Sequence, residues 1–185
     1  MKRIFIAVRI EPQEKLLRMI TSFRQVLKND AVKWTEASNI HITLVFLGDT
    51  EEKRVNEIDD LLKKICSGFG DFELVLSGAG VFRNIRDPRV IWTGIADSVR
   101  MSELNNIISA KLIDTGSKLE TRPFSPHLTL GRVKRLNNIS DLTELVEKYR
   151  DKEIQRVKVT EVILYESILR PEGPVYKPLG RYSLS

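Results

Sequence analysis

The pattern of apolar and polar positions changes its period along the chain, which predicts both strands and helices. Residues 3–10 form a nearly continuous apolar run, as expected for a strand in the middle of a sheet. After Pro12 the apolar positions recur every three or four residues, so we expect a helix with one buried stripe. That stripe consists of Leu16, Leu17, Ile20, Phe23 and Leu27.

Further along, period-two and period-four patterns alternate. Strands are predicted at residues 41–47, 72–82, 89–95 and 127–133, around 157–168 and, as an extended segment, near 175–182. Helices are predicted from about residue 51, at about 99–113 and at about 140–149. Strands and helices in this order indicate an α+β fold.

The order of elements repeats at a nearly constant offset. Residues 3–6 align with 89–92 at +86, and residues 41–44 align with 127–130 at the same offset. A chance echo of strand and helix spacing is the alternative. The only two histidines, His41 and His127, argue against it because both begin the same four-residue pattern. We therefore expect one unit used twice, with a boundary near residue 86.

Composition limits the class of protein. With 185 residues, 42% hydrophobic and 30% charged, the chain should form a single compact domain over residues 1–185, with lobes of about 1–86 and 87–185. No apolar run is long enough to span a membrane, and one cysteine cannot form an internal disulfide. We expect a cytoplasmic monomer. A net charge of +5 is compatible with an anionic partner.

The two repeated segments carry the candidate chemistry. Side chains two residues apart share a strand face, so His41 and Thr43 should project together, as should His127 and Thr129. If the halves pack around a pseudo-twofold axis, all four side chains line one cleft. One histidine could then remove a proton while the other donates one, and the threonines could hydrogen-bond a phosphate oxygen.

Other sites have weaker support. Two histidines and one cysteine are too few for a typical zinc site, and no phosphate-binding loop or serine nucleophile motif occurs. We expect neither a metal nor a cofactor. Cys66 fits a core position, and the acidic residues Asp49, Glu51 and Glu52 fit the start of a helix.

The segments HITLVFLG (41–48) and RPFSPHLTLGR (122–132) resemble the paired H-x-T-x motifs of the two-histidine phosphoesterase superfamily. Within it, the chain resembles the RNA 2′,3′-cyclic phosphodiesterases, also called 2′-5′ RNA ligases. The opening KRIFIAV and the KWT at 33–35 are similar as well.

This resemblance implies a bilobal α+β fold, with two antiparallel sheets, outer helices and an active-site cleft between the lobes. It implies hydrolysis of an RNA 2′,3′-cyclic phosphate to a 2′-phosphate, with a reverse 2′-5′ ligation, on RNA ends such as those of tRNA halves. It also implies that His41 is the proton donor and His127 the proton acceptor, and that Arg132 holds phosphate.

For two candidate binding residues, strand alternation alone does not predict whether the side chain reaches the cleft. Arg132 does not share strand parity with His127 and Thr129, so it reaches the cleft only if the strand bulges or ends near Gly131. Phe124 could stack on the terminal base or pack between the lobes. Arg83, Arg86 and Arg89 could contact RNA phosphates or simply be solvated.

Two other functions stay open at this stage. One is a phosphodiesterase acting on small cyclic or 2′-5′-linked nucleotides, which a cleft without a basic track would favour. The other is a module that binds RNA without chemistry, against which the retention of both H-x-T motifs speaks.

Overall fold

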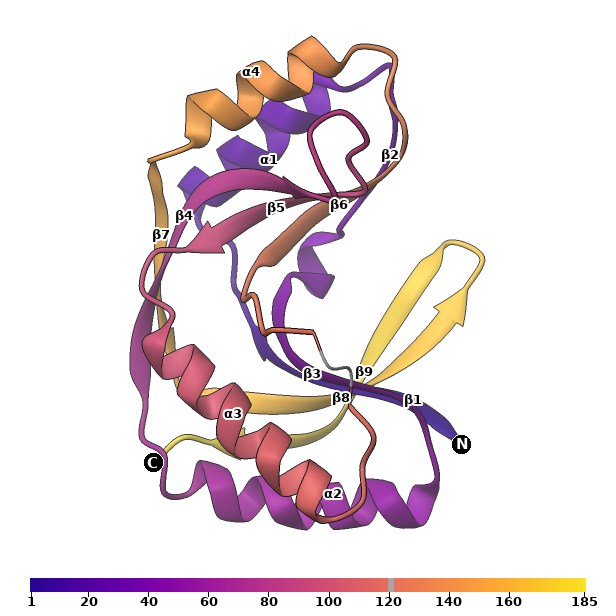
Figure 1. The fold of residues 1–185 in the computed structure, drawn as a ribbon, viewed down its shortest axis with the longest axis vertical. Helices are drawn as coiled ribbons and strands as arrows, with labels where there is room; N and C mark the ends of the chain where they lie inside the picture. The colour runs from indigo at the N-terminus through magenta and orange to yellow at the C-terminus, as the bar shows by residue number, and fades with distance from the viewer. Residues whose placement is uncertain (120–121) are drawn as a thin grey trace.

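A curled antiparallel sheet forms the centre of the molecule, and helices cover its outer side at both ends (Figure 1). The computed structural model describes residues 1–119 and 122–185. Within these residues the strands are β1 (Lys2–Arg9), β2 (Ala31–Trp34), β3 (His41–Thr50), β4 (Phe72–Phe82), β5 (Val90–Ile95), β6 (Leu128–Arg135), β7 (Glu153–Val159), β8 (Glu161–Arg170) and β9 (Gly173–Ser183). The helices are α1 (Glu14–Val26), α2 (Glu52–Cys66), α3 (Val99–Asp114), α4 (Ile139–Tyr149) and the short 3-10 helix η1 (Ala37–Asn39).

The nine-stranded sheet consists of a half with five strands, β2 included, and a half with four strands, which meet at a narrow seam. Its order is β7-β4-β5-β6-β3-β1-β8-β9, and β2 pairs with β6 beside this path. At the seam, β3 and β6 pair through Ile42 and Leu128. The α+β class is confirmed, while the two expected sheets are joined here into one.

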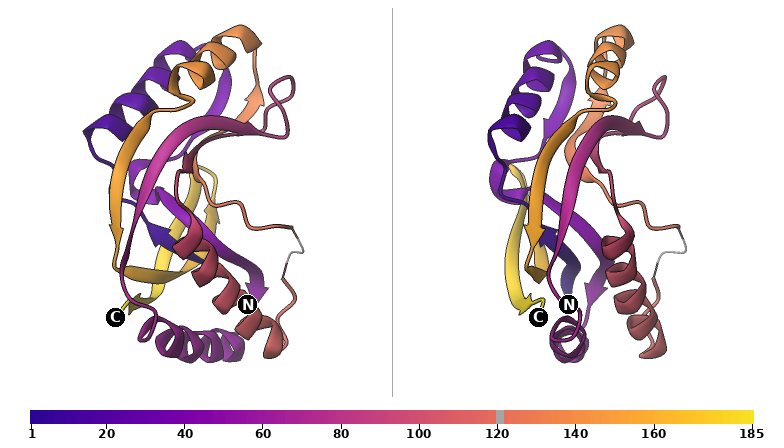
Figure 2. Two further views of the ribbon diagram at one scale, coloured as in Figure 1. Left: turned by 60° about the vertical axis from the view of Figure 1, so that its left-hand side comes forward. Right: turned by 90° about the vertical axis from the view of Figure 1, so that its left-hand side faces the viewer.

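The helices lie in pairs on the outside of the sheet, α1 beside α4 at one end and α2 beside α3 at the other (Figures 1 and 2). Each buries an apolar stripe, which for α1 consists of Leu16, Met19, Ile20 and Phe23. The expected burial of Leu17 is wrong, because Leu17 is 44% exposed. It lies about 100° around the helix from Leu16, outside the buried arc in which Met19 takes its place.

Each half of the sheet contains elements from both ends of the chain. Strand β4 lies between β5 and β7, and α1 packs against α4 and β7. Conversely, α3 packs against α2 and β3, and β8 and β9 extend the half that contains β1. The expected boundary near residue 86 therefore does not coincide with the seam, because the chain crosses between the halves several times.

Strand register is consistent with a duplicated unit and corrects one detail of the expected alignment. Ile6 pairs with Val45, and Ile91 pairs with Gly131. The offset is thus +86 between β3 and β6 but +85 between β1 and β5. One residue matters because it exchanges the two faces of a strand. Ile6 and Ile91, fully buried in the main core, are the equivalent pair.

Candidate active site

The two H-x-T motifs meet at the seam of the sheet. His41 is the first residue of β3, and His127 directly precedes β6. The pair Ile42 and Leu128 is fully buried in the main core, so the residues on either side of each point to the opposite, concave face. The register places the two motifs side by side at the seam, and a cleft shared by both motifs stays a prediction.

Both imidazoles are held by backbone carbonyl groups two residues earlier in the chain. His41 Nδ1 lies 2.6 Å from Asn39 O, and His127 Nδ1 lies 2.7 Å from Ser125 O. Because a carbonyl oxygen only accepts hydrogen bonds, Nδ1 carries the proton in each ring. Each neutral ring therefore leaves Nε2 free to take up a proton, and His41 Nε2 lies 3.1 Å from Thr43 Oγ1.

Aromatic side chains surround the two rings differently. The ring of His41 lies 5.1 Å from that of Phe5 and meets that of Tyr176 edge-on at 5.2 Å. Phe5 in turn stacks on Tyr165, at 5.2 Å between centroids. The ring of His127 meets that of Phe82 edge-on at 4.5 Å.

Burial lowers the pKa of both histidines below the ordinary value. For each ring, loss of solvation is the largest cause, and the hydrogen bond to the backbone carbonyl partly opposes it. The positive charge of Arg132 lowers both pKa values further, and His127 also lowers that of His41. These shifts favour the neutral form of both rings.

A bulge in β6 brings Arg132 to the face of the histidines. Thr129 pairs with Trp92 but Gly131 pairs with Ile91, so Leu130 is an extra residue. After it the facing is reversed, and Arg132 is exposed between two buried neighbours. A bulge near Gly131 was the condition under which Arg132, despite strand alternation, could reach the face of His127 and Thr129.

The same bulge occurs in β3. There, Thr43 pairs with Ala7 and Val45 with Ile6, which makes Leu44 the extra residue. Phe46 is the counterpart of Arg132 and is 42% exposed. The two halves thus have matching backbones but place different side chains at this position.

Several other residues singled out in the sequence pack in the core or form ion pairs with a carboxylate. Phe124 is half-buried and packs against the main core, which favours its structural alternative. Arg83 and Arg89 pair with Asp87, at 2.6 and 3.5 Å. Cys66 is fully buried, and burial raises the pKa of its thiol to about 11, so it fits the expected core position.

The sequence analysis missed the aromatic lining of the cleft. Phe5 was treated as part of a continuous apolar strand, although it forms a separate cluster with Ala7, Ile163 and Tyr165. The alternation of Phe5 and Ala7 with Ile4, Ile6 and Val8 was an available signal. Nothing in the local sequence indicated that Tyr176 would reach His41.

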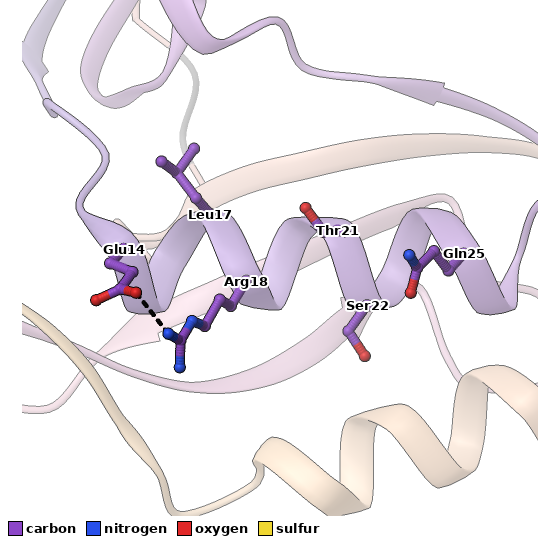
Figure 3. Close-up of a pocket in the computed structure, with 6 residues that line it drawn as sticks. All are labelled: Glu14, Leu17, Arg18, Thr21, Ser22 and Gln25. Atoms are coloured by element: carbon purple, nitrogen blue, oxygen red, sulfur yellow. Dashed lines mark hydrogen bonds and ion pairs between the residues drawn. The ribbon is translucent and has the colours of Figure 1, made fainter.

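We also considered a surface depression, possible metal-ligand groups and possible membrane-spanning helices. The depression in Figure 3 is lined only by α1 residues, among them Leu17 and the ion pair of Glu14 with Arg18. In residues 1–119 and 122–185 no group of three His, Cys, Asp or Glu side chains could hold a metal ion. No helix in these ranges is long and apolar enough to cross a membrane.

Comparison with known proteins gives a consistent family. The family described as LigT like Phosphoesterase matches residues 6–92 and 95–176. The chain is 35% identical over 184 residues to an RNA 2′,3′-cyclic phosphodiesterase of Methanothermobacter thermautotrophicus, covering 98% of each chain. It is 34% identical to one of Archaeoglobus fulgidus, covering 96% of this chain and 97% of that one.

Comparison with solved structures gives the same family. Escherichia coli LigT complexed with 3′-AMP matches with a TM-score of 0.78 and 26% identity, over 100% of this chain and 98% of that one. The Thermus thermophilus protein TT0787, at 24% identity and a TM-score of 0.80, shares the fold. The paired motifs at the seam and these matches over nearly the whole chain show that this protein belongs to the LigT-like family of two-histidine phosphoesterases.

Proposed function

We propose that this protein hydrolyses the 2′,3′-cyclic phosphate at an RNA end to a 2′-phosphate, with His41 and His127 as its acid and base. The observation that carries the proposal is the seam itself, where two imidazoles with matching Nδ1 hydrogen bonds lie on one face of paired strands. Relatives named RNA 2′,3′-cyclic phosphodiesterase, up to 35% identical over nearly the whole chain, support the choice of substrate.

In the proposed reaction, neutral His127 accepts a proton at Nε2 from a water molecule, which attacks phosphorus. Protonated His41 donates its Nε2 proton to the departing 3′ oxygen, so the bond from phosphorus to that oxygen breaks and the phosphate remains on the 2′ oxygen. The bound phosphodiester anion favours protonation of His41, which offsets the effect of burial on its pKa.

The remaining site residues stabilise charge. The hydroxyl groups of Thr43 and Thr129 donate hydrogen bonds to non-bridging phosphate oxygens, and Arg132 attracts the same oxygens. The pKa effect of Arg132 on both histidines supports its position in this group. Stacking of Phe124 on the terminal base stays a prediction, and its packing against the core supports the alternative structural role.

The proposal extends to the biological setting. RNA ends such as those of tRNA halves are the proposed substrates, and 2′-5′ ligation is the proposed reverse reaction. The protein is proposed to act without a metal, as a monomer and in the cytoplasm, since both motifs come from one chain and the single cysteine suits a reducing compartment.

Incubation of the protein with a nucleoside 2′,3′-cyclic phosphate in the presence of EDTA tests the proposal, with the products assigned by phosphorus NMR. We expect turnover to the 2′-phosphate. A 3′-phosphate would reverse the roles of the histidines or the orientation of the substrate. Activity that is lost in EDTA and restored by a divalent metal would contradict the two-histidine mechanism.

A further inference from the structure

Two cations face each other across neighbouring strands next to the candidate active site. Strand β2 pairs with β6 so that Lys33 lies directly opposite Arg132. The neighbours of Lys33 along the strand, Val32 and Trp34, pack against the main core. Lys33 therefore projects to the other face, the face that Arg132 shares with the histidines.

Nothing among the described residues neutralises this pair. Lys33 and Arg132 are both exposed, and neither forms an ion pair with a carboxylate in residues 1–119 and 122–185. Like charges directly opposite each other destabilise a sheet. The fold thus keeps a locally unfavourable arrangement, and an anion bound between or along the two side chains would relieve it.

The β8–β9 hairpin limits where such an anion can lie. A Cβ atom built on Gly173, at the start of β9, would lie 3.4 Å from Lys33 Nζ. The hairpin is tied down nearby, because Asn39 Nδ2 donates a hydrogen bond of 3.0 Å to Pro174 O. Lys33 therefore lies between Arg132 and the start of β9.

Arg132 shares strand β6 with Thr129, whereas Lys33 lies on the neighbouring strand β2. The charge of Arg132 lowers the pKa of His41, His127 and Tyr176, whereas Lys33 is not among the causes of any of these shifts. A chain of phosphates that begins at the histidines and passes Arg132 would meet Lys33 next. Successive phosphates of this kind occur in an oligonucleotide and not in a cyclic mononucleotide.

We propose that Lys33 binds the phosphate that links the terminal nucleotide of the RNA to the preceding one. This inference rests on the proposed function and makes it narrower. The substrate is then an RNA end of at least two nucleotides, and a small cyclic mononucleotide fills only part of the site. Lys33 contributes to binding and takes no part in the chemical step.

The test compares cytidine 2′,3′-cyclic phosphate with the dinucleotide adenylyl-(3′→5′)-cytidine 2′,3′-cyclic phosphate. We expect Lys33→Ala to lower kcat/KM for the dinucleotide about tenfold through KM, and to change the mononucleotide less than twofold. Lys33→Arg should retain most of the dinucleotide activity. Lys15→Ala, an equal change of charge on α1, is the control and should affect neither substrate.

Salt dependence gives an independent readout. The slope of log kcat/KM against log salt for the dinucleotide should become shallower by about 0.7 in Lys33→Ala, as expected for one lost phosphate contact on a single strand. Equal losses on both substrates, or no loss on either, would overturn the subsite while leaving the proposed function intact. Absence of turnover of both substrates by the unaltered protein would instead overturn the function.

Discussion

The two H-x-T motifs have nearly the same backbone but different surroundings. Both histidines bond a carbonyl two residues earlier, and both strands bulge one residue after the threonine. Around His41, however, Phe5 and Tyr176 form a tight aromatic wall, whereas His127 meets only the ring of Phe82 among the described aromatic contacts. A repeated unit thus provides matched geometry, and its neighbours make the two imidazoles chemically different.

The source of this difference is the edge strand of each half. Strand β9 pairs with β8 along its whole length, and its end reaches the cleft with Tyr176. In the other half, β7 occupies the corresponding edge and pairs with β4 only between Phe72 and Ser77. Unequal edge strands therefore give the two imidazoles different surroundings, and the proposed mechanism assigns them different roles in proton transfer.

Replacing either histidine should remove most of the activity, because each motif supplies one histidine to the proposed reaction. His41→Ala and His127→Ala should each lower kcat by about 10²- to 10⁴-fold, because each removes one proton-transfer step. Steady-state kinetics and circular dichroism of both variants check this result. A variant that folds and turns over at a near-normal rate would show that its histidine takes no part in proton transfer.

Substitutions at the two equivalent positions after the bulges should have unequal effects on kcat/KM. Arg132→Ala should lower kcat/KM by roughly 10- to 100-fold, since a charge-assisted contact to phosphate is lost. Phe46→Ala, at the equivalent position of the other half, should change it less than threefold. Kinetics on the same cyclic phosphate compare them, and equal losses would remove Arg132 from the phosphate site.

Substitutions of the two residues whose carbonyl groups bind Nδ1 should also lower kcat by unequal amounts. Asn39 fixes its own carbonyl by bonding the hairpin at Pro174, so Asn39→Ala should lower kcat about tenfold by loosening His41. Ser125→Ala leaves its carbonyl in place and should cost less than twofold. If both variants behave alike, the hairpin does not position His41.

The smallest effect should be seen in histidine titration by NMR. Tyr176→Ala exposes His41, so its pKa should rise towards the ordinary value while that of His127 stays nearly unchanged. Burial disfavours the charged ring in the folded state, so stability should fall as the pH decreases through about 6.5. This loss should be smaller in Tyr176→Ala, and an unshifted His41 would show that Tyr176 does not bury the ring.

Sequence patterns predicted the strands and helices well where apolar periodicity was strong, as in β4 and α4. They missed β2, which is four residues long and has no buried residue. They also gave no boundary between β7 and β8, because only Thr160 separates these strands, which belong to different halves of the sheet. Periodicity describes the face of a strand and not its partner, so neither error could be corrected from the pattern alone.

The part of the candidate site that a single sequence could predict is the part that depends on local alternation. Strand geometry places Thr43 on the face of His41 and Thr129 on the face of His127, while the meeting of the two pairs depends on how the strands pair. The position of Arg132 depended on a bulge, for which the neighbouring glycine gave only a hint. The aromatic wall came from pairings distant in the chain, which a sequence without homologues does not reveal.

The crossing of the chain between the two halves has a consequence for how the molecule can be assembled. A break in the loop between β4 and β5 would give two fragments, and neither would contain a complete half of the sheet with its helix pair. Each fragment alone would leave apolar helix faces and strand edges uncovered, and so should aggregate or stay unfolded. Mixed together, the fragments should recover one structure.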